Sequence, residues 1–159
     1  LREIMFSLTA YFRGKDCEPF PAPFTVVLPE KNQKRKDART VVEPDISVIC
    51  DKAKLHKFGC EGAPDLIVEI LSPSTSSRDM ITKRLLYERH SVKEYWIVDP
   101  VHRILTTYRL TGEKYSTLEH YSHEHILTTD LFPDLEINLA EVFAGMEEII
   151  PEGLRENID

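Results

Sequence analysis

Two acidic residues stand out because they belong to stretches that otherwise read as buried strands. Asp45 precedes the apolar run 46–50, and Glu69 lies inside the apolar run 66–71. A buried carboxylate costs free energy unless it is paired or binds a metal ion. If the two strands are neighbours, the carboxylates can converge at one end of a sheet. Two carboxylates so close together favour either a shared proton or a divalent cation.

Lys83 is the third residue of interest, and it lies in a predicted helix over residues 78–90. Its helical neighbours three and four positions away include apolar and aromatic residues, namely Met80, Leu86 and Tyr87. This setting predicts an inward-facing lysine that needs anions, and the two carboxylates would supply them. Around a metal ion, such a triad could hydrolyse a phosphodiester bond. The same three residues could instead form a buried structural ion pair, and residue types alone leave both interpretations open.

The elements that would position these residues follow from the spacing of apolar side chains. Apolar spacing predicts helices over 1–12 and 78–90, and strands over 24–28, 41–50, 64–71 and 94–99. We expect the four strands to share one mixed sheet flanked by the two helices, which is an α/β fold. The proline-rich stretch 19–23 is expected to be a rigid connector, and 51–63 a polar connection.

The C-terminal third predicts further strands. Residues 103–110 and 114–121 alternate around Gly112 and predict a hairpin that extends the sheet. Residues 135–139 predict a last strand, and 140–143 a short helical turn. The length of 159 residues fits one domain, which we assign to residues 1–150, followed by a polar tail over 151–159. The chain begins inside a predicted helix, so we expect an N-terminal portion to precede it.

Composition limits the classes of function. The net charge of −7 argues against broad electrostatic binding of nucleic acid, but not against a nuclease whose acidic site is neutralised by metal. The basic run 31–39 is either a solvated loop or a contact with phosphates. Among the late residues, His120, His123 and His125 are interpreted as a solvated loop, with a zinc-binding module as the less favoured alternative.

The number of cysteines and the hydropathy of the sequence indicate in which cellular compartment the protein is expected. The three cysteines are odd in number and include no CxxC pair, which argues against a disulfide scaffold and a zinc knuckle. No apolar run approaches the roughly 20 residues needed to span a bilayer. We therefore expect a protein of the reducing cytoplasm with no membrane contact.

Several motifs occur together in a characteristic order. They are EPDISVI (43–49), APDLIVEILSPST (63–75), the helix residues Lys83 and Tyr87, and VKEYWIVDP (92–100). Over about residues 1–143 this order resembles the Uma-type family of restriction endonucleases, which belongs to the PD-(D/E)XK nuclease superfamily. The resemblance implies a restriction-endonuclease-like fold, a site for Mg²⁺ (or Mn²⁺) and a nucleic-acid substrate, expected to be DNA.

The resemblance also implies roles for individual residues. Asp45 matches the Asp of the PD half-motif and Glu69 matches the second acid, with the backbone carbonyl of Ile70 as an expected further metal ligand. The superfamily lysine two places later falls on Leu71, and Lys83 matches the lysine that the family carries on the following helix. The family's acidic N-terminal segment has no match in this sequence. The alternative function is therefore a catalytically inactive nuclease-fold protein that acts as a structural or assembly subunit, for example as a homodimer.

Overall fold

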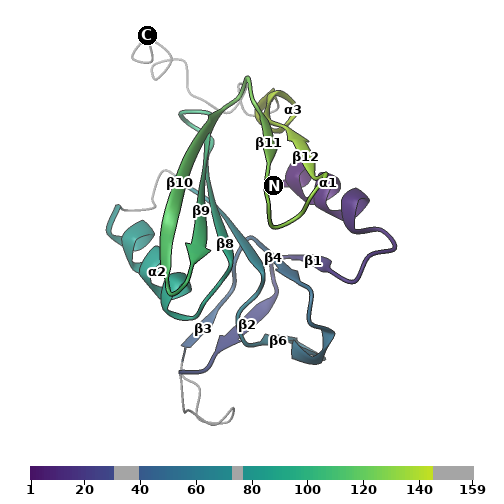
Figure 1. Ribbon diagram of the computed structural model, residues 1–159, viewed down its shortest axis with the longest axis vertical. Helices are drawn as coiled ribbons and strands as arrows, with labels where there is room; N and C mark the ends of the chain where they lie inside the picture. Colours follow the sequence, from purple (N-terminus) through teal and green to yellow (C-terminus); the bar gives the residue numbers. More distant parts are fainter. Residues whose placement is uncertain (31–39, 73–76, 145–159) are drawn as a thin grey trace.

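The computed structural model describes residues 1–30, 40–72 and 77–144 (Figure 1). The basic run 31–39 and the tail 151–159 lie outside the described residues. A six-stranded main sheet has the strand order β1 (Glu18–Pro21), β4 (Ile46–Ile49), β7 (Leu66–Ile70), β8 (Glu94–Asp99), β9 (Ile104–Thr111) and β10 (Lys114–Ser122). Within it, β7 and β8 run parallel and the other neighbours run antiparallel.

One face of the main sheet, which we call the α1 face, is covered by N-terminal and C-terminal elements. These are α1 (Arg2–Phe12), α3 (Leu139–Ala144) and the two-stranded sheet of β11 (Ile126–Thr128) and β12 (Glu136–Asn138). Helix α1 buries Ile4, Leu8 and Phe12, which recur every four residues and therefore line one side of the helix. They pack with Val68 and Trp96 of the sheet in one hydrophobic core.

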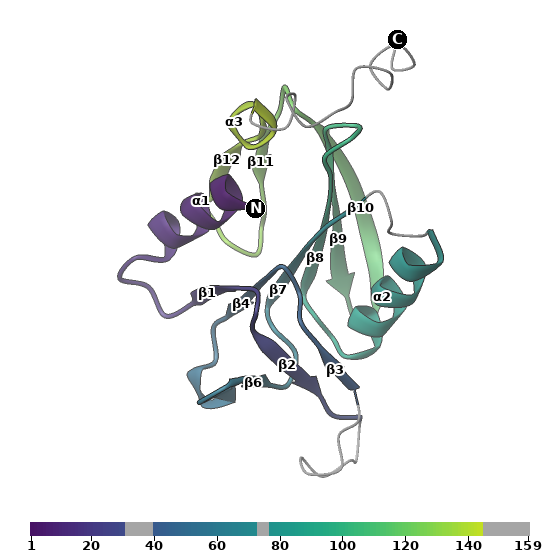
Figure 2. The ribbon, with the colours of Figure 1, turned by 180° about the vertical axis from the view of Figure 1, so that it is seen from behind.

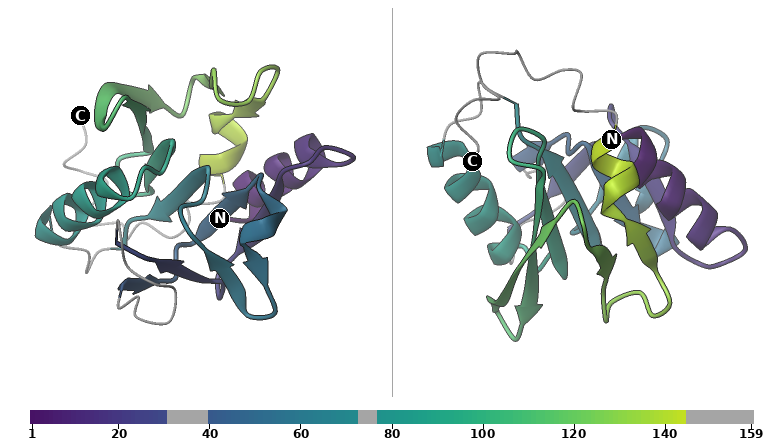
Figure 3. Two further views of the ribbon diagram at one scale, coloured as in Figure 1. Left: turned by 60° about the horizontal axis from the view of Figure 1, so that its bottom comes forward. Right: turned by 90° about the horizontal axis from the view of Figure 1, so that it is seen from above.

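The opposite face, the α2 face, carries a second hydrophobic core. Helix α2 (Ser77–Arg89) lies on this side of the sheet, across from α1 (Figures 2 and 3). Tyr87 of α2 packs here with Ile67 of β7 and Tyr95 of β8. Because side chains alternate along a strand, Val68 faces α1 while Ile67 and Glu69 face α2.

The expected helices and the hairpin are confirmed, whereas the place of one strand was predicted wrongly. Strands β9 and β10 pair antiparallel and extend the main sheet beyond β8. The strand expected at 24–28 is β2 (Thr25–Leu28), but it lies in a second sheet of order β3 (Thr40–Val42), β2, β6 (Gly59–Glu61) and β5 (Leu55–His56). The single strand expected at 41–50 is two strands, because the strand is interrupted before Asp45: β3 belongs to this second sheet and β4 to the main sheet. Strand β4 already has β1 and β7 on its two sides, so no place beside it is left for β2.

Two expected connections are also more ordered than the sequence suggested. The proline-rich stretch contributes β1, an edge strand that pairs with β4, because an edge position tolerates prolines without N–H donors. The segment 51–63 contains a 3₁₀ turn (Lys52–Lys54) as well as β5 and β6. Strand β6 pairs with β2 in parallel, and the chain then continues directly into β7 of the main sheet. This segment therefore connects the two sheets.

Cys17 and Cys50 form a disulfide, although the cysteine count argued against a disulfide scaffold. They are 33 positions apart in sequence, so no spacing motif indicates the pair. The register explains it, because Glu18 lies opposite Ile49 in the antiparallel pair of β1 and β4. The next positions outward are the two cysteines. Cys60 is the free cysteine of the described residues and is buried.

Candidate active site

Asp45 and Glu69 lie opposite one another on neighbouring strands. Ile46 of β4 pairs with Val68 of β7 in antiparallel register, so the next opposed positions are Asp45 and Glu69. The Ile70 backbone N–H donates to Asp45 Oδ2 at 2.7 Å and holds this carboxylate against the end of β7. The register therefore brings the two acids to opposed positions, close enough for the charge of Asp45 to act on Glu69.

The Glu69 carboxylate is buried and held through both oxygen atoms. The Tyr87 hydroxyl donates to Oε1 at 2.7 Å, and Lys83 Nζ lies 3.0 Å from Oε2. Burial raises the pKa of Glu69, the partners Tyr87 and Lys83 oppose the rise, and the charge of Asp45 adds to it. Burial therefore disfavours the anion in spite of these two partners, and a further cation beside Glu69 would favour its ionised form.

Lys83 and Tyr87 reach Glu69 from the same side of α2. They are four residues apart, which places them one helical turn from each other on the side that faces β7. The Lys83 side chain remains 36% exposed, so its ammonium lies at the boundary between the protein and solvent. Tyr87 is fully buried beneath it, and burial together with Glu69 raises the pKa of its hydroxyl. Tyr87 therefore stays a proton donor to Glu69.

The residue types around Asp45 and Glu69 fit a hard divalent cation. The described residues contain no group of three or more His, Cys, Asp or Glu side chains arranged to hold a metal ion. A cation here would take two carboxylates and complete its shell with backbone oxygen and water, which suits Mg²⁺ because Mg²⁺ keeps several waters and few protein ligands. The carbonyl of Ile70, next to Glu69 on β7, stays a prediction as a further ligand.

Asp65, which shares the strand face of Glu69, is not part of this constellation. It lies four residues away at the entry of β7, about 13 Å along the strand. Its Oδ2 accepts from the Cys50 N–H at 2.8 Å, and its Oδ1 lies 2.7 Å from Lys93 Nζ. These contacts join the start of β7 to the residue after β4 and to the residue before β8, so Asp65 has a structural role.

The late histidines lie at the end of the hairpin. His120 Nδ1 is 2.9 Å from the Thr106 hydroxyl, and His125 Nδ1 is 2.8 Å from the Ser122 hydroxyl. Each ring thus contacts a neighbouring hydroxyl.

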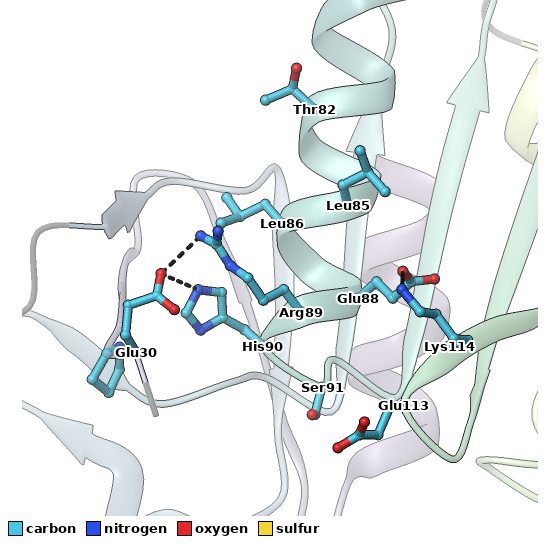
Figure 4. A pocket seen from close by; sticks show the side chains of 11 residues that line it. Glu30, Thr82, Leu85, Leu86, Glu88, Arg89, His90, Ser91, Glu113 and Lys114 are labelled. Atoms are coloured by element: carbon cyan, nitrogen blue, oxygen red, sulfur yellow. Dashed lines mark hydrogen bonds and ion pairs between the residues drawn. The ribbon is translucent and has the colours of Figure 1, made fainter. Parts of the chain in front are cut away.

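A separate hollow lies on the outer side of α2, near its C-terminal end (Figure 4). Arg89 forms an ion pair with Glu30 at 2.9 Å, and the same Glu30 oxygen is 3.6 Å from His90 Nε2. Burial lowers the pKa of His90. The residues that line this hollow include neither of the two carboxylates nor Lys83, so it is distinct from the candidate active site.

The hydrogen bond from Tyr87 to Glu69 was not predicted from the sequence. The position of Tyr87 four residues after Lys83 marked it as an apolar neighbour of the lysine. The same spacing could have indicated a second group directed at the same carboxylate, because residues at i and i+4 share a helix face.

Comparisons with known proteins agree with this architecture. The model of the Uma2 family, described as "Putative restriction endonuclease", matches residues 1–140. A crystal structure of a "putative nuclease belonging to DUF820" from Anabaena variabilis superposes with a TM-score of 0.69 at 18% identity, covering 91% of this chain and 78% of that chain. No curated protein matches the sequence. Within the described residues, no helix is long and apolar enough to cross a membrane.

Proposed function

The chain belongs to the Uma2 family, whose description is "Putative restriction endonuclease", and we propose that it is a metal-dependent nuclease that hydrolyses phosphodiester bonds in DNA. The cation in this proposal is Mg²⁺ or Mn²⁺. The observation that supports it is that Asp45 and Glu69 occupy opposed positions and that Lys83 contacts Glu69.

Each residue has a distinct role in the proposal. Asp45 and Glu69 hold the cation, with the Ile70 carbonyl as a further oxygen ligand. When bound, the cation polarises the scissile phosphate and lowers the pKa of a coordinated water. Lys83, at the solvent boundary, orients the attacking water and stabilises negative charge on the phosphate through its ammonium. The Ile70 N–H keeps Asp45 directed at the same point.

The test is cation binding and DNA cleavage by a Glu69→Ala variant. Removing this carboxylate should abolish both binding of Mg²⁺ in calorimetry and cleavage of plasmid DNA. The chain should stay folded, because removing a buried acid with a raised pKa offsets the loss of the acceptor for the Tyr87 hydroxyl. Circular dichroism and thermal unfolding check that point.

Asp65→Asn is the matched control for this experiment. Asp65 is a buried acid on the same strand and face, but it lies at the other end of β7. This variant should keep the cation affinity and cleavage of the parent chain. A Glu69→Ala protein that still cleaves DNA would contradict the proposal.

A second candidate function is an inactive structural or assembly subunit with the nuclease fold, assembled as a homodimer. The observation that favours it is that both oxygens of Glu69 already have partners within the chain. In that case the triad is a structural ion pair, and Mg²⁺ neither binds the parent chain nor changes its thermal stability. Calorimetry on the parent chain separates the two functions.

A further inference from the structure

The two oxygens of Glu69 are held by groups of different kinds. Oε2 faces the Lys83 ammonium, which is partly exposed, while Oε1 faces the Tyr87 hydroxyl in the protein interior. A hydrogen bond to a buried oxygen fixes the rotation of the carboxylate about its last side-chain bond. Lys83, at the end of a long flexible side chain, constrains that rotation less.

Tyr87 itself has little freedom to move. Its ring is fully buried and packs edge-on against Tyr95, with the ring centroids 4.9 Å apart. It also belongs to the α2-face core together with Ile67, a neighbour of Glu69 on the same strand face. The hydroxyl is therefore held at a fixed point relative to β7, 2.7 Å from Glu69 Oε1.

We propose that Tyr87 is a positioning residue of the cation site, which sets the Glu69 carboxylate in the orientation that binds the divalent ion. This inference rests on the proposed function, because it requires Asp45 and Glu69 to bind a cation. Tyr87 does not itself contact the cation in this proposal. Partners that orient a metal-binding side chain commonly change metal affinity by about 10–100-fold when removed.

Tyr87→Phe is the direct test, because phenylalanine keeps the buried ring and removes the hydroxyl alone. The variant should bind Mg²⁺ about 10–100-fold more weakly than the parent chain in calorimetry, at a temperature at which circular dichroism shows both proteins folded. Cation affinity is a readout that a purely structural role of Tyr87 would leave unchanged.

Tyr115→Phe is the matched control. Tyr115 is a partly buried tyrosine that packs against the same core, and its hydroxyl donates to the Val92 carbonyl at 3.0 Å, away from Glu69. Its loss should affect thermal stability and leave the Mg²⁺ affinity unchanged. Equal Mg²⁺ affinity in the parent chain and Tyr87→Phe would overturn the inference while leaving the proposed function intact. A parent chain that binds no Mg²⁺ would overturn the proposed function itself.

A measurement on the parent chain covers the case in which Tyr87→Phe does not fold. The tyrosine Cζ atoms can be labelled isotopically and followed by nuclear magnetic resonance during addition of Mg²⁺. The Tyr87 signal should shift, because the electron density at Glu69 Oε1 changes when the carboxylate binds a cation, and the Tyr115 signal should not. Saturation of Mg²⁺ binding without a shift at Tyr87 would overturn the inference.

Discussion

Lys83 and Lys93 make nearly the same contact at opposite ends of β7. Lys83 Nζ lies 3.0 Å from Glu69, and Lys93 Nζ lies 2.7 Å from Asp65. Both carboxylates are buried and both lysines reach solvent. The difference between the ends is that Glu69 alone has a second carboxylate, Asp45, on the opposed position of the neighbouring strand. The two lysines therefore form a natural pair for comparison.

Replacement of Lys83 by alanine should lower DNA cleavage by about 10²–10³-fold, the usual effect of removing one donor that stabilises transition-state charge. Mg²⁺ binding should persist, because an ammonium is not a metal ligand. The free energy of unfolding should fall by only about 1 kcal/mol, since the side chain is 36% exposed and solvent screens the ion pair. Single-turnover cleavage, calorimetry and urea denaturation measure the three quantities.

Lys93→Ala is the control variant for the losses of cleavage and of stability expected in Lys83→Ala. It removes an ion pair of similar geometry and should leave the cleavage rate unchanged while lowering stability by a similar amount. If both variants lose cleavage equally, Lys83 acts only through the fold, and its assignment to the reaction is wrong.

At the scale of single residues, the alternation of side chains along β7 was sufficient to predict that Glu69 shares a face with Asp65. It did not separate the roles of these two acids, because Lys93 lies beyond the predicted helix and its contact is long-range. The prediction that Asp45 lies near Glu69 depended on the further assumption that β4 and β7 are neighbours in the sheet. Register is a property of the pair of strands, and neither strand encodes it alone.

At the scale of elements, a buried polar cluster connects β8 and β9 to the segment after β11. Glu94 is 1% exposed, and its carboxylate accepts from Trp96 Nε1 at 3.0 Å, from Arg109 Nε at 3.0 Å and from the Thr129 hydroxyl. Arg109 also lies 2.6 Å from Asp130. The Glu94 carboxylate therefore accepts hydrogen bonds from β8, from β9 and from the segment after β11, and connects these three elements.

Glu94→Ala should lower the free energy of unfolding by about 2–4 kcal/mol, because it leaves several donors without an acceptor in a buried position. The value is at the lower end for a buried charge pair because Arg109 is 27% exposed and keeps Asp130. Urea denaturation measures the loss, and Glu136→Ala, which removes an exposed carboxylate of β12, is the control that should stay near the parent value. A loss below about 0.5 kcal/mol, as for an ordinary surface change, would show that the cluster does not stabilise the fold.

The helices and strands were easier to predict from the sequence than the pairing of strands within the sheets. Apolar periodicity identified α1, α2 and the hairpin, because each depends on contacts that are close in sequence. It did not place β2, whose parallel partner β6 lies more than 30 residues later. Nor did it indicate the Cys17–Cys50 bridge, which depends on the pairing of β1 with β4. What the sequence could not provide was long-range pairing.

At the scale of the whole molecule, the net charge of −7 opposes contact with a polyanion. Binding of DNA should therefore depend on the cation more than on basic side chains. With the cleavage-deficient Lys83→Ala variant, fluorescence anisotropy of a labelled duplex should detect much tighter binding in Mg²⁺ than in a chelator. The Glu69→Ala variant should lack this gain, although its net charge is less negative by one. Tight binding in the chelator with a steep salt dependence would indicate a basic surface instead.

The two edges of the main sheet differ in a way that limits how copies of this chain could associate. In the part of the chain that the structure describes, β1 is a four-residue edge with Pro19 and Pro21, whereas β10 is a nine-residue edge without proline. Joining β10 of one copy to β1 of the next is a head-to-tail contact that builds a ring or an open fibre, and the prolines of β1 disfavour that route. Joining β10 to β10 uses the same surface twice, generates two-fold symmetry and stops at two copies. If copies of this chain add strands to this sheet, its two edges therefore favour a closed pair over a head-to-tail chain.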